Sequence, residues 1–316
     1  MNKNNDRIAI LRDRAAMLAK AREFFAQRNV IEVDCPILSL VADIDTHINL
    51  ITALYNQTDT CYLHPSPEYG MKCLLSEGIG DIYQLSHVFR DGEYSHKHNP
   101  EFMMMEWYRQ NFTFMELISE TLDFIRVFLG DLPQTIISYR EVFQRYAGFD
   151  YVKADKKDLL AYIQAKNIPM HAHIEDEEKD ALLTIILTFD IEPHLGKDEL
   201  CALAYYPSTQ AALAKTLQRD DEQVAERFEV YYQGVELCNG YHELTDPVEQ
   251  RKRIAQANQA RIKLGKQALP VDENFLKALE RGLPDSCGVA VGFDRLMMLR
   301  HQTNNLSDVI PFRLKK

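Results

Sequence analysis

The sequence has no pair of cysteines spaced as C-x-x-C, although it contains six cysteines in total. A zinc-binding pattern and a small disulfide framework both require closely or regularly spaced cysteines, so their scatter argues against both. The chain also lacks the G-x-x-x-x-G-K-[ST] phosphate loop, which excludes a P-loop nucleotide site. The scattered thiols are Cys35, Cys61, Cys73, Cys201, Cys238 and Cys287.

The sequence has no apolar run long enough to span a membrane, and its first residues lack the apolar core of a signal peptide. We therefore expect a cytoplasmic protein without a membrane association. Basic residues are in the minority, since 36 Lys and Arg stand against 47 Asp and Glu and give a net charge of −11. A protein that binds a long phosphate backbone usually has a basic surface, so this charge does not favour a large nucleic-acid interface.

The stretch 81–108 predicts a β-hairpin, because two strand-like segments flank a polar loop with an Asp-Gly turn signal. On a period of two, the second strand places Phe102, Met104, Glu106 and Tyr108 on one face. A buried carboxylate is costly without a partner, so Glu106 on this face indicates a binding site. An amphipathic hairpin with its polar face in water explains the stretch equally well.

The stretch 228–241 predicts a second hairpin, whose two-residue loop contains Gly234. This loop places Tyr231 opposite Glu236, and Glu229 then lies diagonal to Glu236, roughly 7–8 Å away. Two carboxylates this close repel each other unless a cation lies between them. Magnesium, held by phosphate oxygens and one or two carboxylates, fits this pattern. Two exposed carboxylates on a solvated face are the alternative.

A third informative stretch is a strand of small residues, 288–291, that leads through Gly292 into an apolar helix. Arg295 lies in the first turn of that helix, where a cation opposes the helix dipole. An anionic ligand above the helix start explains this arginine. An ion pair with the neighbouring Asp294 is the alternative.

A helix over residues 8–27 and a strand over 30–36 open the chain. This pair has no second layer of its own, so it packs on a later sheet or on another subunit. Ser66 is expected to cap a helix that begins near residue 69, and capping alone would also explain Glu68 in its first turn. The other segments predict a strand over 200–206, a mostly helical segment over 153–190, and helices over 112–129, 138–148, 246–264 and 274–281.

Three stretches together resemble motifs 2 and 3, and the segment between them, of the class II aminoacyl-tRNA synthetases, with the lysyl subtype most similar. They are F-R-x-x-E…N-P-E-F…E-x-Y, E-x₆-E-x₂-N-G-x₂-E and G-V-A-V-G-F-D-R. The first helix with Pro36 resembles motif 1, so the resemblance covers nearly the whole chain. It implies an α+β fold with a mostly antiparallel sheet flanked by helices. It also implies a single catalytic domain over residues 1–316, a helical insertion at about 150–200, and a homodimer through the N-terminal helix and strand.

Two departures narrow this resemblance. The first predicted helix begins so early that no room is left before it for the anticodon-binding OB-fold domain of lysyl-tRNA synthetases. In motif 3, Ala290 replaces the middle glycine of G-x-G-x-G-x-D-R. Both features are similar to the lysyl-tRNA synthetase paralogues that attach (R)-β-lysine to elongation factor P. The resemblance therefore implies elongation factor P as the acceptor, lysine or (R)-β-lysine as the small substrate, and no role for tRNA.

The resemblance also implies ATP and Mg²⁺ as cofactors and an aminoacyl adenylate as the first product. The attacking carboxylate is already anionic, so the step needs positioning and charge neutralisation rather than a general base. Arg90 is implied to bind the α-phosphate and the carboxylate, and Arg295 the γ-phosphate, because a planar guanidinium suits both. Phe102 is implied to stack on adenine against Arg295, and either Glu93 or the backbone of Gly92 would recognise that base. The other implied nucleotide contacts are Asp91, Asn99, Glu236, Leu237 and Gly292.

On the lysine side, Glu243 and Tyr108 are implied to hold the ε-ammonium group, and Glu68 the nearer amine. A desolvated ammonium needs such partners, so neutral analogues should be rejected. Ala290 adds one methyl group to the expected pocket floor, where it would crowd an α-amine but leave room for a β-amine. The implied metal ligands are Glu229 and Glu236, and the remaining implied substrate contacts are Ser66, Pro67, Glu106 and Asn239.

Two other functions remain open at this point. A truncated lysyl-tRNA synthetase would charge tRNA and would need a basic surface. A catalytically inactive paralogue would serve as a binding or regulatory subunit, and its site residues would be eroded. Arg90, Glu229, Glu236 and Arg295 are all present, which disfavours the inactive paralogue.

Overall fold

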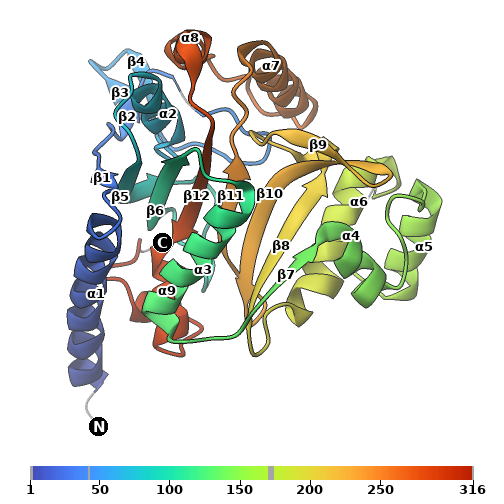
Figure 1. The fold of residues 1–316 in the computed structure, drawn as a ribbon, viewed down its shortest axis with the longest axis horizontal. Helices are drawn as coiled ribbons and strands as arrows, with labels where there is room; N and C mark the ends of the chain where they lie inside the picture. Colours follow the sequence, from blue (N-terminus) through green and yellow to red (C-terminus); the bar gives the residue numbers. More distant parts are fainter. Residues whose placement is uncertain (1–2, 42, 170–173, 315–316) are drawn as a thin grey trace. The chain divides into compact units, whose positions relative to one another are not determined.

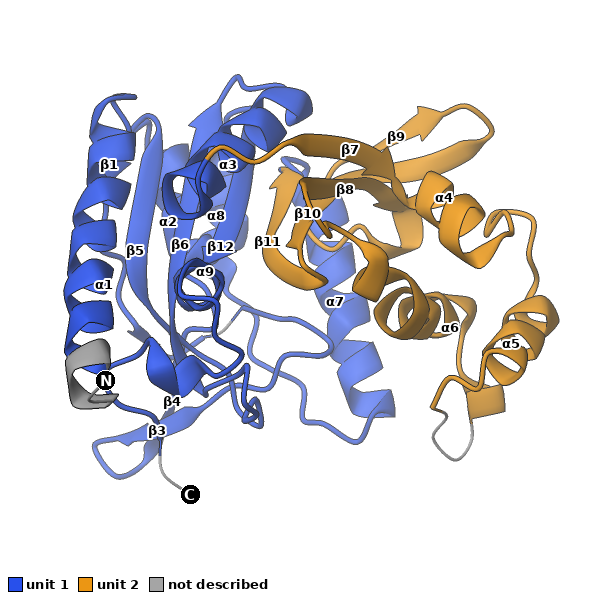
Figure 2. Cartoon of the chain, turned by 90° about the horizontal axis from the view of Figure 1, so that it is seen from below, with its two compact units in different colours: residues 1–130, 243–316 blue, residues 131–242 orange. Residues whose placement is uncertain are grey.

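The structure is a computed structural model that describes residues 3–41, 43–169 and 174–314. It divides the chain into two compact units, unit 1 with residues 1–130 and 243–316, and unit 2 with residues 131–242 (Figure 2). Each unit combines helices with a mostly antiparallel sheet, which confirms the expected α+β class. The prediction of one catalytic domain over the whole chain stays a prediction.

The main strands of unit 1 are neighbours in the order β1-β5-β6-β12 (Figure 1). The pair β1·β5 is parallel, whereas β5·β6 and β6·β12 are antiparallel. The predicted hairpin is therefore confirmed as β5 and β6, and the third predicted stretch supplies β12 beside it. The bounds are β1 (Ile31–Glu32), β5 (Ile82–Phe89), β6 (Glu101–Gln110) and β12 (Ser286–Gly292).

The predicted strand over 30–36 is wrong in length, since β1 has only two residues. The backbone N–H of Val33 still donates to the Tyr83 carbonyl oxygen at 2.8 Å. The N–H of Cys35, however, donates to the side-chain Oε1 of Gln84 at 2.7 Å, so the ladder ends there. The sequence also gave no indication of a small second sheet of order β2-β4-β3. Its strands are β2 (Leu38–Ser39), β3 (Thr52–Tyr55) and β4 (Asp59–Leu63).

Helices cover one face of the unit 1 strands. Trp107 of β6 is fully buried, and its ring centroid lies 5.2 Å from that of Phe25 and 5.3 Å from that of Phe124. These two rings belong to α1 (Lys3–Ala26) and α3 (Phe114–Leu129), which are the predicted helices over 8–27 and 112–129. Because side chains alternate along a strand, the even-numbered side chains of β6 face the opposite side.

Among the described residues of unit 1, four further α-helices fall close to their predicted positions. They are α2 (Glu68–Ser76), α7 (Pro247–Lys263), α8 (Glu273–Gly282) and α9 (Phe293–Arg300). Tyr69 of α2 stacks on Phe275 of α8, with ring centroids 4.0 Å apart, so these two helices pack together. No helix of the described residues is long and apolar enough to cross a membrane.

In unit 2 the strand order is β11-β10-β8-β7, and β9 also pairs with β10. The second predicted hairpin is confirmed as β10 and β11, and both of its loop residues, Gln233 and Gly234, have positive φ. Positive φ at both positions is the requirement of a tight two-residue hairpin turn. The bounds are β7 (Gln134–Ser138), β8 (Leu200–Pro207), β9 (Thr216–Arg219), β10 (Glu222–Tyr232) and β11 (Val235–His242).

The helices of unit 2 form an apolar core with β7, β8 and β10. The predicted helix over 138–148 is capped by Ser138, as expected, but it continues after four residues as a π-helical turn. The helical expectation for 153–190 includes residues 170–173, which lie outside the described residues. The helical segments are α4 (Tyr139–Val142), α5 (Lys156–Ala165), α6 (Lys179–Ile186) and the π-helical turns Phe143–Ala147 and Leu187–Ile191.

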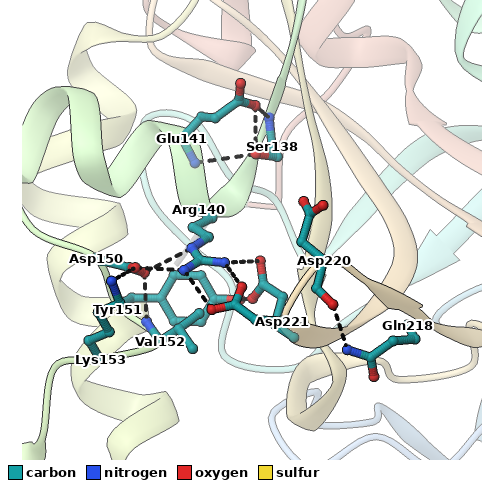
Figure 3. A network of polar contacts seen from close by, with 11 residues as sticks. Ser138, Arg140, Glu141, Asp150, Tyr151, Val152, Lys153, Gln218, Asp220 and Asp221 are labelled. Carbon is teal, nitrogen blue, oxygen red and sulfur yellow. Dashed lines mark hydrogen bonds and ion pairs between the residues drawn. The ribbon is translucent and has the colours of Figure 1, made fainter.

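One ion-pair network joins the helical part of unit 2 to the β9–β10 turn. The guanidinium of Arg140, on α4, bonds to Asp150 with Nη2–Oδ2 2.7 Å and also to Asp221 in the turn (Figure 3). Arginine can bond two carboxylates at once because its planar head carries five N–H donors. Arg140 thus joins α4, the segment after it and the turn.

Candidate active site

The even-numbered face of β6 carries a buried carboxylate with two hydroxyl partners. Glu106 is only 2% exposed, which excludes the solvated-hairpin alternative for this residue. Its Oε1 accepts from the Tyr108 hydroxyl at 2.7 Å, and its Oε2 from the Ser66 hydroxyl at 2.6 Å. Ser66 also accepts the backbone N–H of Glu68 at 3.1 Å, and Pro67 lies directly before α2. The expected cap by Ser66 is wrong, because α2 begins at Glu68 with Pro67 at its N-cap position and without a side-chain cap.

The structure brings Glu68, Glu106 and Glu243 together with a buried ammonium, and we call this group of four the carboxylate cluster. The ammonium belongs to Lys72, four residues after Glu68 on α2 and therefore on the same helix face. Its Nζ lies 2.6 Å from Oε2 of Glu243 and also contacts Glu68. Lys72 was not among the residues predicted from the sequence, although its spacing from Glu68 was a usable signal.

Gly288 on β12 allows the close approach of the Tyr108 and Glu243 side chains. A Cβ atom at this position would overlap the Tyr108 ring and lie 2.6 Å from Oε1 of Glu243. Two strand positions along, Ala290 is directly opposite Glu106 in the β6·β12 register and is partly exposed. Ala290 therefore lies beside the carboxylate cluster, where the sequence analysis expected it. The glycine that is sterically required is nevertheless Gly288.

Burial and mutual repulsion change the ionisation of this region. Burial, together with the charge of Glu68, raises the pKa of Glu106 to about 8. Burial raises the pKa of Asp43 well above its usual range, and its Oδ2 has no hydrogen-bond partner among the described residues. Burial also raises the pKa of the Tyr108 hydroxyl, so it donates to Glu106. At neutral pH, Glu106 is therefore mostly protonated when no substrate is bound, and the protonated form of Asp43 is favoured in the same direction.

Arg90 directly follows β5, and its guanidinium lies over the Phe102 ring, 5.2 Å from the centroid. Its nearest acidic group is Glu93, with Nη1–Oε1 3.9 Å, and its buried Nε has no hydrogen-bond partner among the described residues. A partly exposed guanidinium with an unused buried donor fits an anionic ligand. Asp91 accepts the N–H of the next residue, Gly92, and both are exposed.

Arg295 of α9 bonds to a histidine of the β5–β6 loop. Its Nη2 lies 3.1 Å from Nε2 of His98, whose pKa is lowered by burial and by the adjacent guanidinium. A guanidinium can only donate, so Nε2 of His98 must be the acceptor. Asp294 does not supply the alternative explanation for Arg295, because its Oδ1 pairs with Arg14 at 2.5 Å and its Oδ2 accepts the Met103 N–H at 2.8 Å.

Asn99 and Gly292 lie in the same region of unit 1. The amide of Asn99 is buried and donates to the Glu101 carbonyl oxygen at 2.6 Å, while its Oδ1 accepts from the Leu314 N–H at 3.4 Å. Gly292 is the N-cap position of α9. The roles expected for both residues stay predictions.

In unit 2, the register of the second hairpin is confirmed next to its loop, where Tyr231 pairs with Glu236. The expected position of Glu229, diagonal to Glu236, is wrong, because the register shifts between Val230 and Tyr231. A bulge after Val230 then places Asn239, three residues beyond Glu236, opposite Glu229. Glu229 is only 7% exposed, so the alternative of an exposed carboxylate is wrong for it. Its Oε2 accepts from Tyr206 at 2.6 Å and from Tyr231 at 2.5 Å, and its Oε1 accepts from Arg227 at 2.6 Å.

Oxygen atoms of unit 2 fit a hard cation. Glu192, which the sequence analysis missed, has a pKa raised to about 7 by burial and by the charges of Glu229 and Glu236. The buried Oδ1 of Asn239 has no hydrogen-bond partner among the described residues. Carboxylate and amide oxygens are the ligands that Mg²⁺ prefers. Leu237 is buried, and no group of three or more acidic, His or Cys side chains in the described residues has the arrangement of a complete metal site.

Comparison with known proteins decides the family. The family model of class II tRNA synthetases (D, K and N) matches residues 1–316. The chain belongs to the class II tRNA synthetase family. Among curated proteins, it is 42% identical over 304 residues to the elongation factor P–(R)-β-lysine ligase of Haemophilus influenzae, covering 95% of this chain and 93% of that protein. It is also 42% identical over 308 residues to the ligase of that name from Enterobacter sp. (strain 638), covering 96% and 94% of the two chains.

These comparisons confirm the class II resemblance that the three motifs indicated. As a class II synthetase with ligases as relatives, this protein is itself a ligase. The motif residues are now placed in two structural settings. Arg90, Glu106, Glu243 and Arg295 belong to unit 1, whereas the second hairpin with Glu229 and Glu236 belongs to unit 2.

Proposed function

We propose that this protein activates (R)-β-lysine, or lysine, with ATP as an aminoacyl adenylate and transfers it to a lysine ε-amine of elongation factor P. The observation that carries the proposal is the carboxylate cluster, in a chain whose relatives are named as ligases of this specificity. A buried set of carboxylates suits a substrate with ammonium groups, because each desolvated ammonium needs an anionic partner. We further propose that the protein acts in the cytoplasm as one catalytic domain and does not use tRNA.

On the amine side, Glu243 and Tyr108 hold the ε-ammonium, and Glu68 holds the nearer amine. Glu106 fixes the orientation of Tyr108 by accepting a hydrogen bond from its hydroxyl group, with Ser66 on the other oxygen. Ala290, opposite Glu106 in the register, supplies the methyl group that disfavours an α-amine. Neutral analogues leave these buried acids unpaired and are therefore rejected.

On the phosphate side, Arg90 binds the α-phosphate and the substrate carboxylate, and Arg295 binds the γ-phosphate. Phe102 stacks on adenine, and the loop with Asp91, Gly92 and Glu93 recognises its edge. Because the nucleophile is anionic, these residues accelerate the step by positioning it and by neutralising charge.

Glu229 and Glu236 are proposed to hold Mg²⁺, with Leu237 and Asn239 beside them on β11. The hydrogen bonds described for Glu229 use three of about four lone-pair positions of a carboxylate, so one stays available for a cation. When bound, Mg²⁺ would neutralise the charge of the phosphate oxygens. The tyrosines and Arg227 hold Glu229 in a fixed orientation.

We also propose a homodimer through the N-terminal helix and strand. Large apolar side chains of this part of the chain are exposed, including Ile8 at 49%, Ile31 at 48% and Leu40 at 64%. Exposed apolar side chains of this size are typical of a protein–protein interface when they form a contiguous patch, and these three lie within the first 40 residues of the chain. The short edge strand β1 would also be covered by such a contact.

Intact mass of elongation factor P tests the main proposal. The factor is incubated with this protein, ATP, magnesium and (R)-β-lysine, with tRNA-lysine as a parallel acceptor. The expected result is that elongation factor P gains the mass of one β-lysyl group while the tRNA stays uncharged. Labelled tRNA with unmodified factor would instead identify a tRNA synthetase.

A matched pair of arginine variants shows that the mass gain comes from this site. Arg90→Ala should abolish both ATP–pyrophosphate exchange and the mass gain. Arg251→Ala should keep both, because that arginine is half exposed and pairs only with surface Glu273 among the described partners. Absence of exchange and of any acceptor product with the unmodified protein would indicate an inactive binding subunit.

A further inference from the structure

Lys72 is a lysine with almost no contact with solvent, at 1% exposure. Lysine is rarely buried unless it is paired, and this ammonium is paired twice, with Glu243 and with Glu68. Its Nζ also lies 5.9 Å from the centroid of the Tyr108 ring. All three of these contacts are residues to which the proposed function assigns the amines of the substrate. Lys72 is therefore part of the amine-recognition chemistry, although no role has been assigned to it so far.

The charges of the carboxylate cluster do not balance by themselves. Three carboxylates, Glu68, Glu106 and Glu243, surround a single ammonium, so full ionisation leaves two negative charges in excess. Uncompensated buried charge is costly, and a buried acid avoids this cost by keeping its proton. The raised pKa of Glu106 shows this response in the protein without substrate.

The other titratable groups around the cluster are uncharged or already engaged. Burial raises the pKa of the Cys35 thiol to about 11 and raises the pKa of Tyr108 well above its usual value, so both are neutral. Burial also raises the pKa of Asp43, which favours its protonated form. Asp272 caps α8, where its Oδ1 accepts two backbone N–H groups. The excess of two charges therefore belongs to the cluster itself.

We propose that Lys72 is a specificity-determining residue, which fixes the charge of the carboxylate cluster at the value that complements two ammonium groups. This inference rests on the proposed activation of a diamino acid. A substrate with two ammonium groups neutralises the fully ionised cluster, and Glu106 gives up its proton when that substrate binds. A substrate with one ammonium group leaves one buried carboxylate unpaired. Without Lys72, two ammonium groups no longer suffice, and the cluster keeps a proton to higher pH.

Variants of Lys72 test the inference through the pH dependence of kcat/KM. ATP–pyrophosphate exchange is measured against (R)-β-lysine and lysine from about pH 6 to about pH 9. Lys72→Met should raise the KM for the diamino acid about tenfold or more at neutral pH and leave the KM for ATP near its original value. The acidic limb of the Lys72→Met profile, where kcat/KM falls as the pH is lowered, should move to higher pH by about one unit. The reason is that loss of a nearby cation raises carboxylate pKa values. Lys72→Arg should keep the limb in place, since it keeps the charge.

A purely structural lysine gives a different pattern. Lys72→Met would then lower stability and the amount of active protein but would leave the acidic limb at its original pH, and this result would overturn the inference. Tighter binding of the diamino acid by Lys72→Met would also overturn it, because Lys72 would then be a competitor for the amine position. Lys153→Met is the matched control, since the Lys153 side chain is 76% exposed, and all its parameters should stay unchanged.

A second variant keeps the test decisive if Lys72→Met does not fold. The double variant Lys72→Gln/Glu68→Gln removes one positive and one negative group, so it restores two excess negative charges. The acidic limb of its kcat/KM profile should return toward the original pH, even if its KM for the diamino acid does not return to the original value. A limb that is the same in all of these proteins would overturn the inference. If the unmodified protein shows no exchange with any diamino acid, the proposed function fails instead, so the two failures are distinguishable.

Discussion

Substitution of Gly288 by alanine is the most direct test of the proposed amine site. The added Cβ would overlap the Tyr108 ring and lie 2.6 Å from Oε1 of Glu243. Both side chains are buried, at 2% and 1% exposure, so neither can move away freely. Overpacking of this kind costs about 1–3 kcal/mol. If the cost falls on amine binding, the KM for (R)-β-lysine should rise by about tenfold to a hundredfold, since ~1.4 kcal/mol is a factor of ten.

The assay is ATP–pyrophosphate exchange, with the KM values for (R)-β-lysine and for ATP measured separately. The KM for ATP should change little, because no group proposed to contact the nucleotide lies next to the added methyl group. Val289→Ile is the matched control, as it adds one carbon to the same strand. Val289 is opposite Trp107 in the register, on the helix-covered face. This control should lose stability in thermal unfolding but keep the KM for β-lysine. A Gly288→Ala protein with an unchanged KM for β-lysine would refute the proposed site.

Three further outcomes are expected. Ala290→Gly should shift the preference from β-lysine toward α-lysine by about tenfold or more, since one methyl group decides the fit, and an unchanged ratio of kcat/KM values would contradict this role. Glu192 holds a proton in the folded protein up to about pH 7, whereas the unfolded chain loses it near its usual pKa of 4.5, so stability falls as pH rises through this window. Without magnesium, Glu192→Gln should therefore be more stable than the unmodified protein at about pH 8, by about 1–2 kcal/mol after allowance for screening, and equal to it near pH 4. If urea unfolding gave the same difference in free energy of unfolding between the two proteins at both pH values, this prediction would be contradicted. Ile31→Glu should give a monomer in light scattering if the N-terminal strand forms the dimer contact, whereas Val248→Glu, at a 76% exposed position on α7, should not.

Local patterns in the sequence determined both hairpins and the helices beside them. The alternation along residues 102–108 placed Glu106 and Tyr108 on one face, and the two-residue loop at Gly234 set the pairing of Tyr231 with Glu236. Such features depend on side-chain period and turn chemistry, which act within a few residues. The three motifs were likewise sufficient to identify the class II family.

Other features depend on contacts between distant segments. The predicted strand over 30–36 ends early because the side chain of Gln84, on another strand, takes the N–H of Cys35. Asp294 pairs with Arg14 across 280 positions rather than with its neighbour Arg295. No local pattern contains these partners, so propensity alone could not predict them.

The carboxylate cluster shows the same division. The sequence supplied Glu68, Glu106 and Glu243 as candidates, but only the tertiary structure brought them around Lys72 and assigned the close approach to Gly288. Period and spacing determine which way a side chain faces along its own element. Which charges are buried together depends on packing between α2, β6, β12 and the segment before α7. The net charge of a buried site is thus decided by the tertiary structure, because burial is what makes each charge costly.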